Sequence, residues 1–214
     1  MVRVKICGIR NADDYIASHR AGADWVGLVF FPKSPRNLTL DQAAKIRASA
    51  DKLTGIKTPL LVALVVDASD ELLDGITSAV RPDLIQCHGN ESPERIAKIK
   101  SKYAAAVMKA IRVKSEESLI DAAAYDGIAD MLLFDSAPID ASLPGGTGHA
   151  FDWGMMDAYI GTSPWMLAGG LTPDNVADAI RISSAMAVDV SSGVEKTPGQ
   201  KDHAAIQHFV SAAL

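Results

Sequence analysis

A cysteine and an aspartate, each at the end of a predicted strand, are the first candidates for proton-transfer chemistry. Cys7 ends residues 2–7, and Asp135 follows the apolar residues 131–134. Partial burial raises the pKa of a carboxyl group towards values useful to a general acid. A thiol acts as a base near neutral pH only where its thiolate is stabilised, and Lys5 could do this. Taken alone, a buried small side chain and a turn residue would explain the same two positions.

Two loops late in the chain have the composition of a phosphate site. The candidate binding residues in them are Gly169, Gly170, Ser191, Ser192 and Gly193. Glycine lets backbone amides approach an anion without a Cβ in the way, and serine hydroxyls add donors. Tight strand-to-helix turns would explain either loop by itself, so the position of the two loops in the fold decides between a turn and a phosphate site.

Two further loops carry groups suited to substrate recognition. Residues 30–39 form a loop stiffened by two prolines, and Arg36 in it suits bidentate recognition of a carboxylate. A solvated surface arginine is the simpler alternative. Residues 144–148, Pro-Gly-Gly-Thr-Gly, suggest a lid that closes over a substrate, although a long loop can equally be a mere connection.

Polar residues also cluster at positions 86–88, Gln-Cys-His. We interpret Cys87 as a packing residue, and Gln86 and His88 as polar lining of a site. Most solitary histidines are structural, so the sequence assigns no catalytic role to His88.

The elements that must position these residues form a repeat. Eight runs of β-branched and aliphatic residues are each followed by a turn and a stretch of helical period. They begin near Val2, Trp25, Leu60, Asp83, Ala106, Asp130, Trp165 and Met186. Steps of 21 to 35 residues fit one strand, one helix and two loops, as parallel strands require. Eight such units predict an α/β fold of the closed (β/α)8 TIM barrel type, because an open doubly wound sheet more often has fewer strands.

Capping patterns place four helix starts, at Asn11, Thr39, Ser92 and Thr172. The helix expected over residues 115–126 is rich in alanine and acid and should be short or irregular. No Pro/Gly/Ser-rich linker divides the chain, so we expect one domain over residues 1–214.

Barrel geometry gives the candidate residues a common location. Alternation along the first strand turns Val4 and Ile6 towards the helices and leaves Cys7 facing the lumen, at the carboxyl end where active sites of such barrels lie. Asp135 should face the same chamber. The loops after the seventh and eighth strands are the usual phosphate site of this fold.

Composition excludes several classes of function. The chain has 214 residues and 21 Lys plus Arg against 26 Asp plus Glu, a net charge of −5, so nucleic-acid binding is not expected. No apolar run is long enough to span a membrane, and we expect a soluble cytoplasmic protein. Two cysteines are too few for a disulfide framework and lack the paired spacing of a zinc site, so no metal is expected.

Taken in order, the motifs resemble those of phosphoribosylanthranilate isomerases, which act in tryptophan biosynthesis, in their monofunctional form. The resemblance runs end to end. It rests on residues 5–9, 30–36, 86–89, 134–136, 145–153, 168–171 and 189–195. The cysteine after the first strand, together with the Ser-Pro-Arg loop, is the most specific part of the match. Cys87 is a minor departure, because an apolar residue is usual there.

The resemblance implies a role for each candidate residue. Cys7 would be the general base, Asp135 the general acid, and Arg36 the group that holds the anthranilate carboxylate. The two glycine loops would hold the phosphate. The reaction implied is the Amadori rearrangement of N-(5-phosphoribosyl)anthranilate, a small phosphorylated substrate, with the chain as a monomer or homodimer. No cofactor is expected, because the imine intermediate is its own electron sink.

Two rival interpretations remain at this point. Another sugar-phosphate isomerase or epimerase on the same scaffold would share the phosphate loops but would need neither Arg36 nor Cys7. A barrel that binds phosphate without catalysis is the non-enzymatic alternative, and it would show no turnover.

Overall fold

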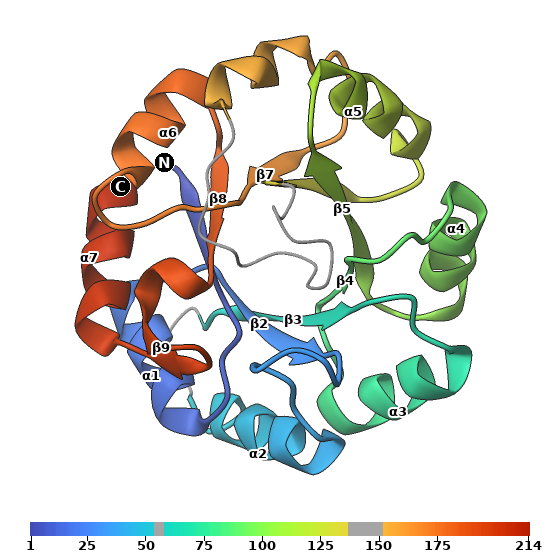
Figure 1. The fold of residues 1–214 in the computed structure, drawn as a ribbon. Coiled ribbons are helices and arrows are strands. Elements are labelled where there is room, and N and C mark those ends of the chain that lie inside the picture. The colour runs from blue at the N-terminus through green and yellow to red at the C-terminus, as the bar shows by residue number, and fades with distance from the viewer. Residues whose placement is uncertain (54–57, 137–151) are drawn as a thin grey trace.

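Eight parallel strands close into a barrel in chain order, and Figure 1 shows the helices arranged in a ring around them. The computed structural model describes residues 1–53, 58–136 and 152–214. The strands are β1 Arg3–Cys7, β2 Trp25–Phe30, β3 Leu60–Val65, β4 Leu84–Cys87, β5 Ala106–Val113, β6 Met131–Ser136, β7 Trp165–Leu167 and β8 Ala187–Val190. The predicted (β/α)8 barrel is confirmed, and each strand begins within one residue of its expected start.

Seven α-helices and three short 3₁₀ helices cover the barrel in the described part of the chain. The α-helices are α1 Ala12–Ala21, α2 Leu40–Ala50, α3 Asp70–Val80, α4 Pro93–Lys102, α5 Glu116–Asp121, α6 Val176–Ser183 and α7 His203–Ala213. The 3₁₀ helices are η1 Ala122–Tyr125, η2 Trp153–Ala158 and η3 Ser192–Val194. An antiparallel hairpin, β9 Glu195–Thr197 with β10 Gln200–Lys201, follows η3. No helix among these residues is long and apolar enough to cross a membrane.

Three of the four predicted helix starts are correct. The side chains of Asn11, Thr39 and Ser92 each accept a backbone N–H in the first turn of α1, α2 and α4. The irregular fifth helix is also confirmed, since α5 passes directly into the 3₁₀ helix η1. The proposed lid at residues 144–148 lies outside the described residues.

The start predicted at Thr172 is wrong, because α6 begins at Val176. The side chain of Asn175 explains the difference. Its Oδ1 accepts from the Thr172 N–H at 2.8 Å, and its Nδ2 donates to the Gly170 carbonyl at 3.0 Å. These bonds hold the residues before α6 in turns and leave the loop after β7 longer than the capping pattern indicated.

Apolar side chains fill two separate layers. One cluster lies between the sheet and the surrounding helices and contains Val4, Ile6 and Cys87. The other contains alternate strand residues, among them Trp25, Leu133 and Met166, and fills the lumen. Because side chains fill the lumen, it leaves no room for a ligand, and active sites of this fold lie at the carboxyl ends of the strands.

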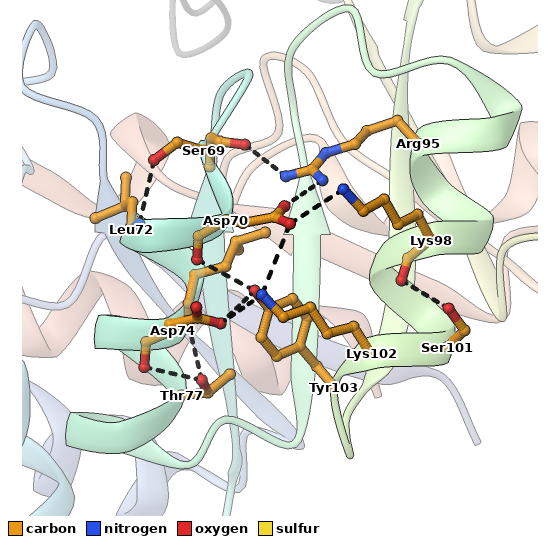
Figure 2. A network of polar contacts seen from close by, with 12 residues as sticks. Ser69, Asp70, Leu72, Asp74, Thr77, Arg95, Lys98, Ser101, Lys102 and Tyr103 are labelled. Atoms are coloured by element: carbon orange, nitrogen blue, oxygen red, sulfur yellow. Dashed lines mark hydrogen bonds and ion pairs between the residues drawn. The ribbon is translucent and has the colours of Figure 1, made fainter.

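On the outer surface, an ion-pair network joins α3 to α4 (Figure 2). Asp70 contacts Arg95, Lys98 at 3.1 Å and Lys102 at 3.7 Å, and the Tyr103 hydroxyl donates to Asp74 at 2.7 Å. The hydrogen bond from Arg95 is the chief reason that the pKa of Asp70 is lowered to about 2. Exposed pairs of this kind are screened by solvent, so we expect them to orient the two helices more than to stabilise the fold.

At the amino ends of the strands, one type of hydrogen bond occurs at three places in the barrel. Asp24, Asp83 and Asp130 each immediately precede an even-numbered strand. Each carboxylate accepts the N–H of the second residue of the preceding odd-numbered strand, at 3.0, 2.8 and 2.9 Å respectively. The repeated bond ties neighbouring strands together where they begin.

We predict that Asp83→Ala lowers the free energy of unfolding by about 1–3 kcal/mol, because it leaves the buried Leu61 N–H without its acceptor. Urea unfolding measures the change. Asp157→Ala, at an exposed position of η2, is the control and should change stability by less than about 0.5 kcal/mol. Equal effects of the two substitutions would show that the strand-start bond contributes nothing.

Candidate active site

One small cavity at the carboxyl ends of the strands brings half of the eight candidate residues together, whereas Gly169, Gly170, Ser192 and Gly193 do not line it. It is lined by Cys7, Val29, Phe31, Ser34, Arg36, Leu64, Val66, His88, Asp135, Asp189 and Ser191. Cys7 from β1 and Asp135 from β6 are both buried, with 4% and 6% of their surfaces exposed. Four candidates from the sequence, Cys7, Arg36, Asp135 and Ser191, therefore share one chamber.

A much larger hollow of about 890 Å³ lies between residues 10–14 and residues 196–204. Polar side chains line it, but it contains none of the candidate residues, whereas the cavity of about 70 Å³ around Cys7 contains four. We therefore place the chemistry in the smaller cavity.

A buried ion pair lies next to Cys7. Lys5 Nζ is 2.9 Å from Asp189 Oδ1, and the two residues are direct partners between β1 and β8. Burial alone would lower the pKa of Lys5, but the Asp189 carboxylate raises it above its ordinary value. Lys5 is thus a charged group committed to Asp189.

Lys5 acts on Cys7 in the expected direction, because its positive charge favours the thiolate, but burial outweighs this effect. Burial is the largest influence on the thiol and raises its pKa; the positive charges of Lys5 and Lys201 act in the opposite direction, and Asp189 adds to the rise. The net direction is upward. In the described structure, Cys7 is a thiol that ionises above the ordinary range, with two cations near it.

Asp135 has a histidine neighbour that the sequence did not connect with it. His88 Nε2 lies 3.3 Å from Asp135 Oδ2, and Gln86 Nε2 lies 2.9 Å from His88 Nδ1. Because the Gln86 amide nitrogen donates to Nδ1, a neutral His88 carries its proton on Nε2, the side facing Asp135. Gln86 and His88 are polar lining, as expected, and His88 also contacts the candidate acid.

The loop that carries His88 is held by a second buried acid, Glu91. Its carboxylate accepts from the Gly89 N–H at 2.9 Å and the Asp67 N–H at 2.9 Å, and it pairs with Lys109 Nζ at 3.0 Å. These bonds tie the loops after β3 and β4 to strand β5. These hydrogen bonds therefore hold the backbone of the loop that places His88 next to Asp135.

Arg36 is not a free surface arginine. Its Nε and Nη2 donate to Glu195 Oε1 and Oε2 at 2.8 and 2.7 Å, and its own N–H donates to Ser34 Oγ at 3.1 Å. The guanidinium lines the cavity, and Glu195 already occupies one of its edges. A planar guanidinium has a second pair of donors on Nη1 and Nη2, which leaves a fork for another carboxylate.

The two glycine loops contact each other. Gly169 and Gly170 follow β7 with positive φ angles of 88° and 68°, and Ser191 leads from β8 into η3. A Cβ on Gly193 would lie 2.0 Å from the Leu171 carbonyl oxygen, so only glycine allows this approach. Glycine-rich loops of this kind let backbone amides approach an anion such as phosphate.

Three charged residues of the site were missed by sequence reasoning: Asp189, Glu195 and Lys201. Asp189 gave the same signal as Asp135, an acid in a lumen-facing position of an apolar strand, and could have been found. Glu195 and Lys201 lie in the hairpin after η3, which is not part of the βα repeat. Glu195 ends the motif at residues 189–195 that carried part of the family resemblance, but no local pattern assigned a role to either residue.

The fold and the cavity define a class of protein: a (β/α)8 barrel with a cysteine, an aspartate and an arginine around one chamber, near two glycine loops that contact each other. A family model for N-(5'-phosphoribosyl)anthranilate (PRA) isomerase matches residues 4–212. An isomerase of that name from Cereibacter sphaeroides is 50% identical over 213 residues, covering 99% of this chain and 98% of the relative. A second, from Parvibaculum lavamentivorans, is 46% identical over 219 residues, covering 99% and 98%. The chain belongs to the phosphoribosylanthranilate isomerase family.

Solved structures agree with this assignment. The phosphoribosylanthranilate isomerase of Thermotoga maritima is similar with a TM-score of 0.86 and 35% identity, covering 100% of this chain and 98% of that one. A structure of such an isomerase in complex with reduced 1-(o-carboxyphenylamino)-1-deoxyribulose 5-phosphate has a TM-score of 0.82, with the same identity and coverage.

We predict that Cys7 in the folded chain ionises at a higher pH than in the unfolded chain, because burial raises its pKa. The rate of iodoacetamide alkylation against pH, measured on a Cys87→Ala variant with and without urea, gives both midpoints. Access to reagent changes the overall rate but not the midpoint. A folded-state midpoint at or below the unfolded one would contradict the role assigned to burial.

Proposed function

We propose that the chain converts N-(5'-phosphoribosyl)anthranilate to 1-(o-carboxyphenylamino)-1-deoxyribulose 5-phosphate by an Amadori rearrangement. The observation that carries this proposal is the shared cavity, in which Cys7 and Asp135 face the same space as Arg36. The relatives named for this reaction, and the related structure with the reduced product, support the choice of substrate. The rival enzymes on this scaffold would have no use for a buried cysteine next to a carboxylate-binding arginine.

In the first step, Asp135 as a carboxylic acid donates its proton to the ribose ring oxygen. The bond between C1 and that oxygen breaks, and the nitrogen lone pair forms the imine, which is protonated and carries the positive charge. Asp135 is left as a carboxylate. The Nε2 proton of His88, on the side facing Asp135, stabilises the negative charge that develops there.

In the second step, the Cys7 thiolate removes the proton from C2. The electrons of the C–H bond form a C1–C2 double bond, and the imine accepts the displaced pair on nitrogen, giving an enolamine. The hydroxyl at C2 then loses its proton while C1 gains one, so the product is a ketone. C2 is oxidised and C1 is reduced within the same molecule, and no external oxidant is involved.

Binding groups hold the two ends of the substrate. We assign the phosphate to the loops that contain Gly169 and Gly170 and residues 191–193, and the anthranilate carboxylate to the second fork of Arg36. Held at both ends, the substrate would have C1 and C2 between the acid and the base, which is the positioning that proton transfer requires.

Three expectations from the sequence stay predictions: one domain over residues 1–214, a cytoplasmic location, and a monomeric or homodimeric state.

We predict that Cys7→Ala and Asp135→Asn each lower kcat by roughly two to four orders of magnitude, the usual range for loss of one positioned proton-transfer group. The decrease in anthranilate-adduct fluorescence measures turnover. Cys87→Ala is the matched control: this second buried cysteine packs outside the lumen, and its loss should leave kcat nearly unchanged. If Cys7→Ala retains the wild-type kcat, the base lies elsewhere and the mechanism fails.

A further inference from the structure

Glu195 has no role in the proposed mechanism, although its side chain is only 3% exposed. Its Oε1 accepts from Arg36 Nε at 2.8 Å and Lys201 Nζ at 2.8 Å. Its Oε2 accepts from Arg36 Nη2 at 2.7 Å and the Gly199 N–H at 3.2 Å. Burial would raise the pKa of Glu195, but these cationic partners hold it below its ordinary value, so the group is an anion.

We propose that Glu195 is a positioning residue, which aims Arg36 at the carboxylate of the substrate and ties that subsite to the phosphate loop. The proposal rests on the proposed function. A planar guanidinium held along one edge by two charge-assisted hydrogen bonds has its other edge fixed in direction. Glu195 therefore sets the direction of the remaining donor pair of Arg36, on Nη1 and Nη2.

The backbone makes room for this arrangement. Gly8 follows Cys7 directly and has a φ of +81°, and a Cβ there would lie 2.5 Å from Arg36 Cδ. The arginine thus crosses over the end of β1, immediately next to the candidate base. Its position is set jointly by Gly8 on one side and Glu195 on the other.

Lys201 extends the same network to the phosphate loop. Its side chain is fully buried, and Nζ donates both to Glu195 and to the Ser191 carbonyl at 2.9 Å. Glu195 is thus shared between two basic groups, and the free edge of Arg36 is left for a substrate carboxylate to pair with. One buried acid therefore connects the carboxylate subsite with the backbone that follows β8.

A merely structural role, in which Glu195 only holds the hairpin of β9 and β10, makes a different prediction. Loss of the hairpin would weaken every ligand alike. Loss of Arg36 positioning weakens only ligands that carry the carboxylate.

The test measures the affinities of two compounds by calorimetry: the reduced product, and the same phosphorylated aminopolyol with an unsubstituted phenyl ring. Glu195→Gln should weaken the reduced product roughly 10- to 100-fold, the range for a lost charge-assisted contact, and the phenyl compound less than about threefold. KM should rise with little change in kcat. In an Arg36→Ala background the effect of Glu195→Gln should vanish, because the two residues then act as one unit.

Controls separate the possible failures. Lys196→Ala, at an exposed position of the same hairpin, should leave both affinities unchanged, and thermal melting verifies that each variant is folded. Glu195→Asp keeps the charge with a shorter reach and should restore part of the preference for the carboxylate if Glu195→Gln folds poorly. Equal weakening of both compounds, no weakening of either, or additivity with Arg36→Ala overturns the proposal. If the wild type binds neither compound, the proposed function itself has failed.

Discussion

The ion pair between Lys5 and Asp189 is the interaction on which the site depends most. It joins β1 to β8, the first and last strands of the barrel, at the point where the sheet closes. Both groups are buried, so removal of either partner would leave an uncompensated charge in the lumen, at a cost of about 3–5 kcal/mol. Cys7 lies two residues after Lys5, on the same face of β1. The register of β1 against β8 therefore also sets the position of the candidate base.

A second group of charged residues lies at the same end of the barrel. In it, Glu195 is paired with Lys201 on one side and with Arg36 on the other. Such an arrangement keeps several ionised side chains out of water without leaving one unpaired. Two cations, Lys5 and Lys201, offset part of the effect of burial on the pKa of Cys7, and the barrel holds these charges near the thiol in advance.

Most of the fold and part of the site could be predicted from the sequence. Strand starts and helix caps are local signals, which is why the strands, and the caps at Asn11 and Thr39, agree with the structure. The start of α6 was misplaced because the bonds of Asn175 to the loop before it are not visible in a capping pattern. Likewise, the contact of Arg36 with Glu195 joins residues 159 positions apart, and no local period encodes it.

In the proposed mechanism, Cys7 and Asp135 act on one substrate from two sides of the same chamber. A crystal structure of this chain with reduced 1-(o-carboxyphenylamino)-1-deoxyribulose 5-phosphate would show whether they do. We expect the phosphate at the amides of Gly170, Ser192 and Gly193, the carboxylate at Arg36, and C2 about 3.5 Å from Cys7 Sγ, the distance of a reactive approach. A ligand bound with its C2 turned away from Cys7, or with its phosphate in the larger hollow between residues 10–14 and 196–204, would rule this mechanism out.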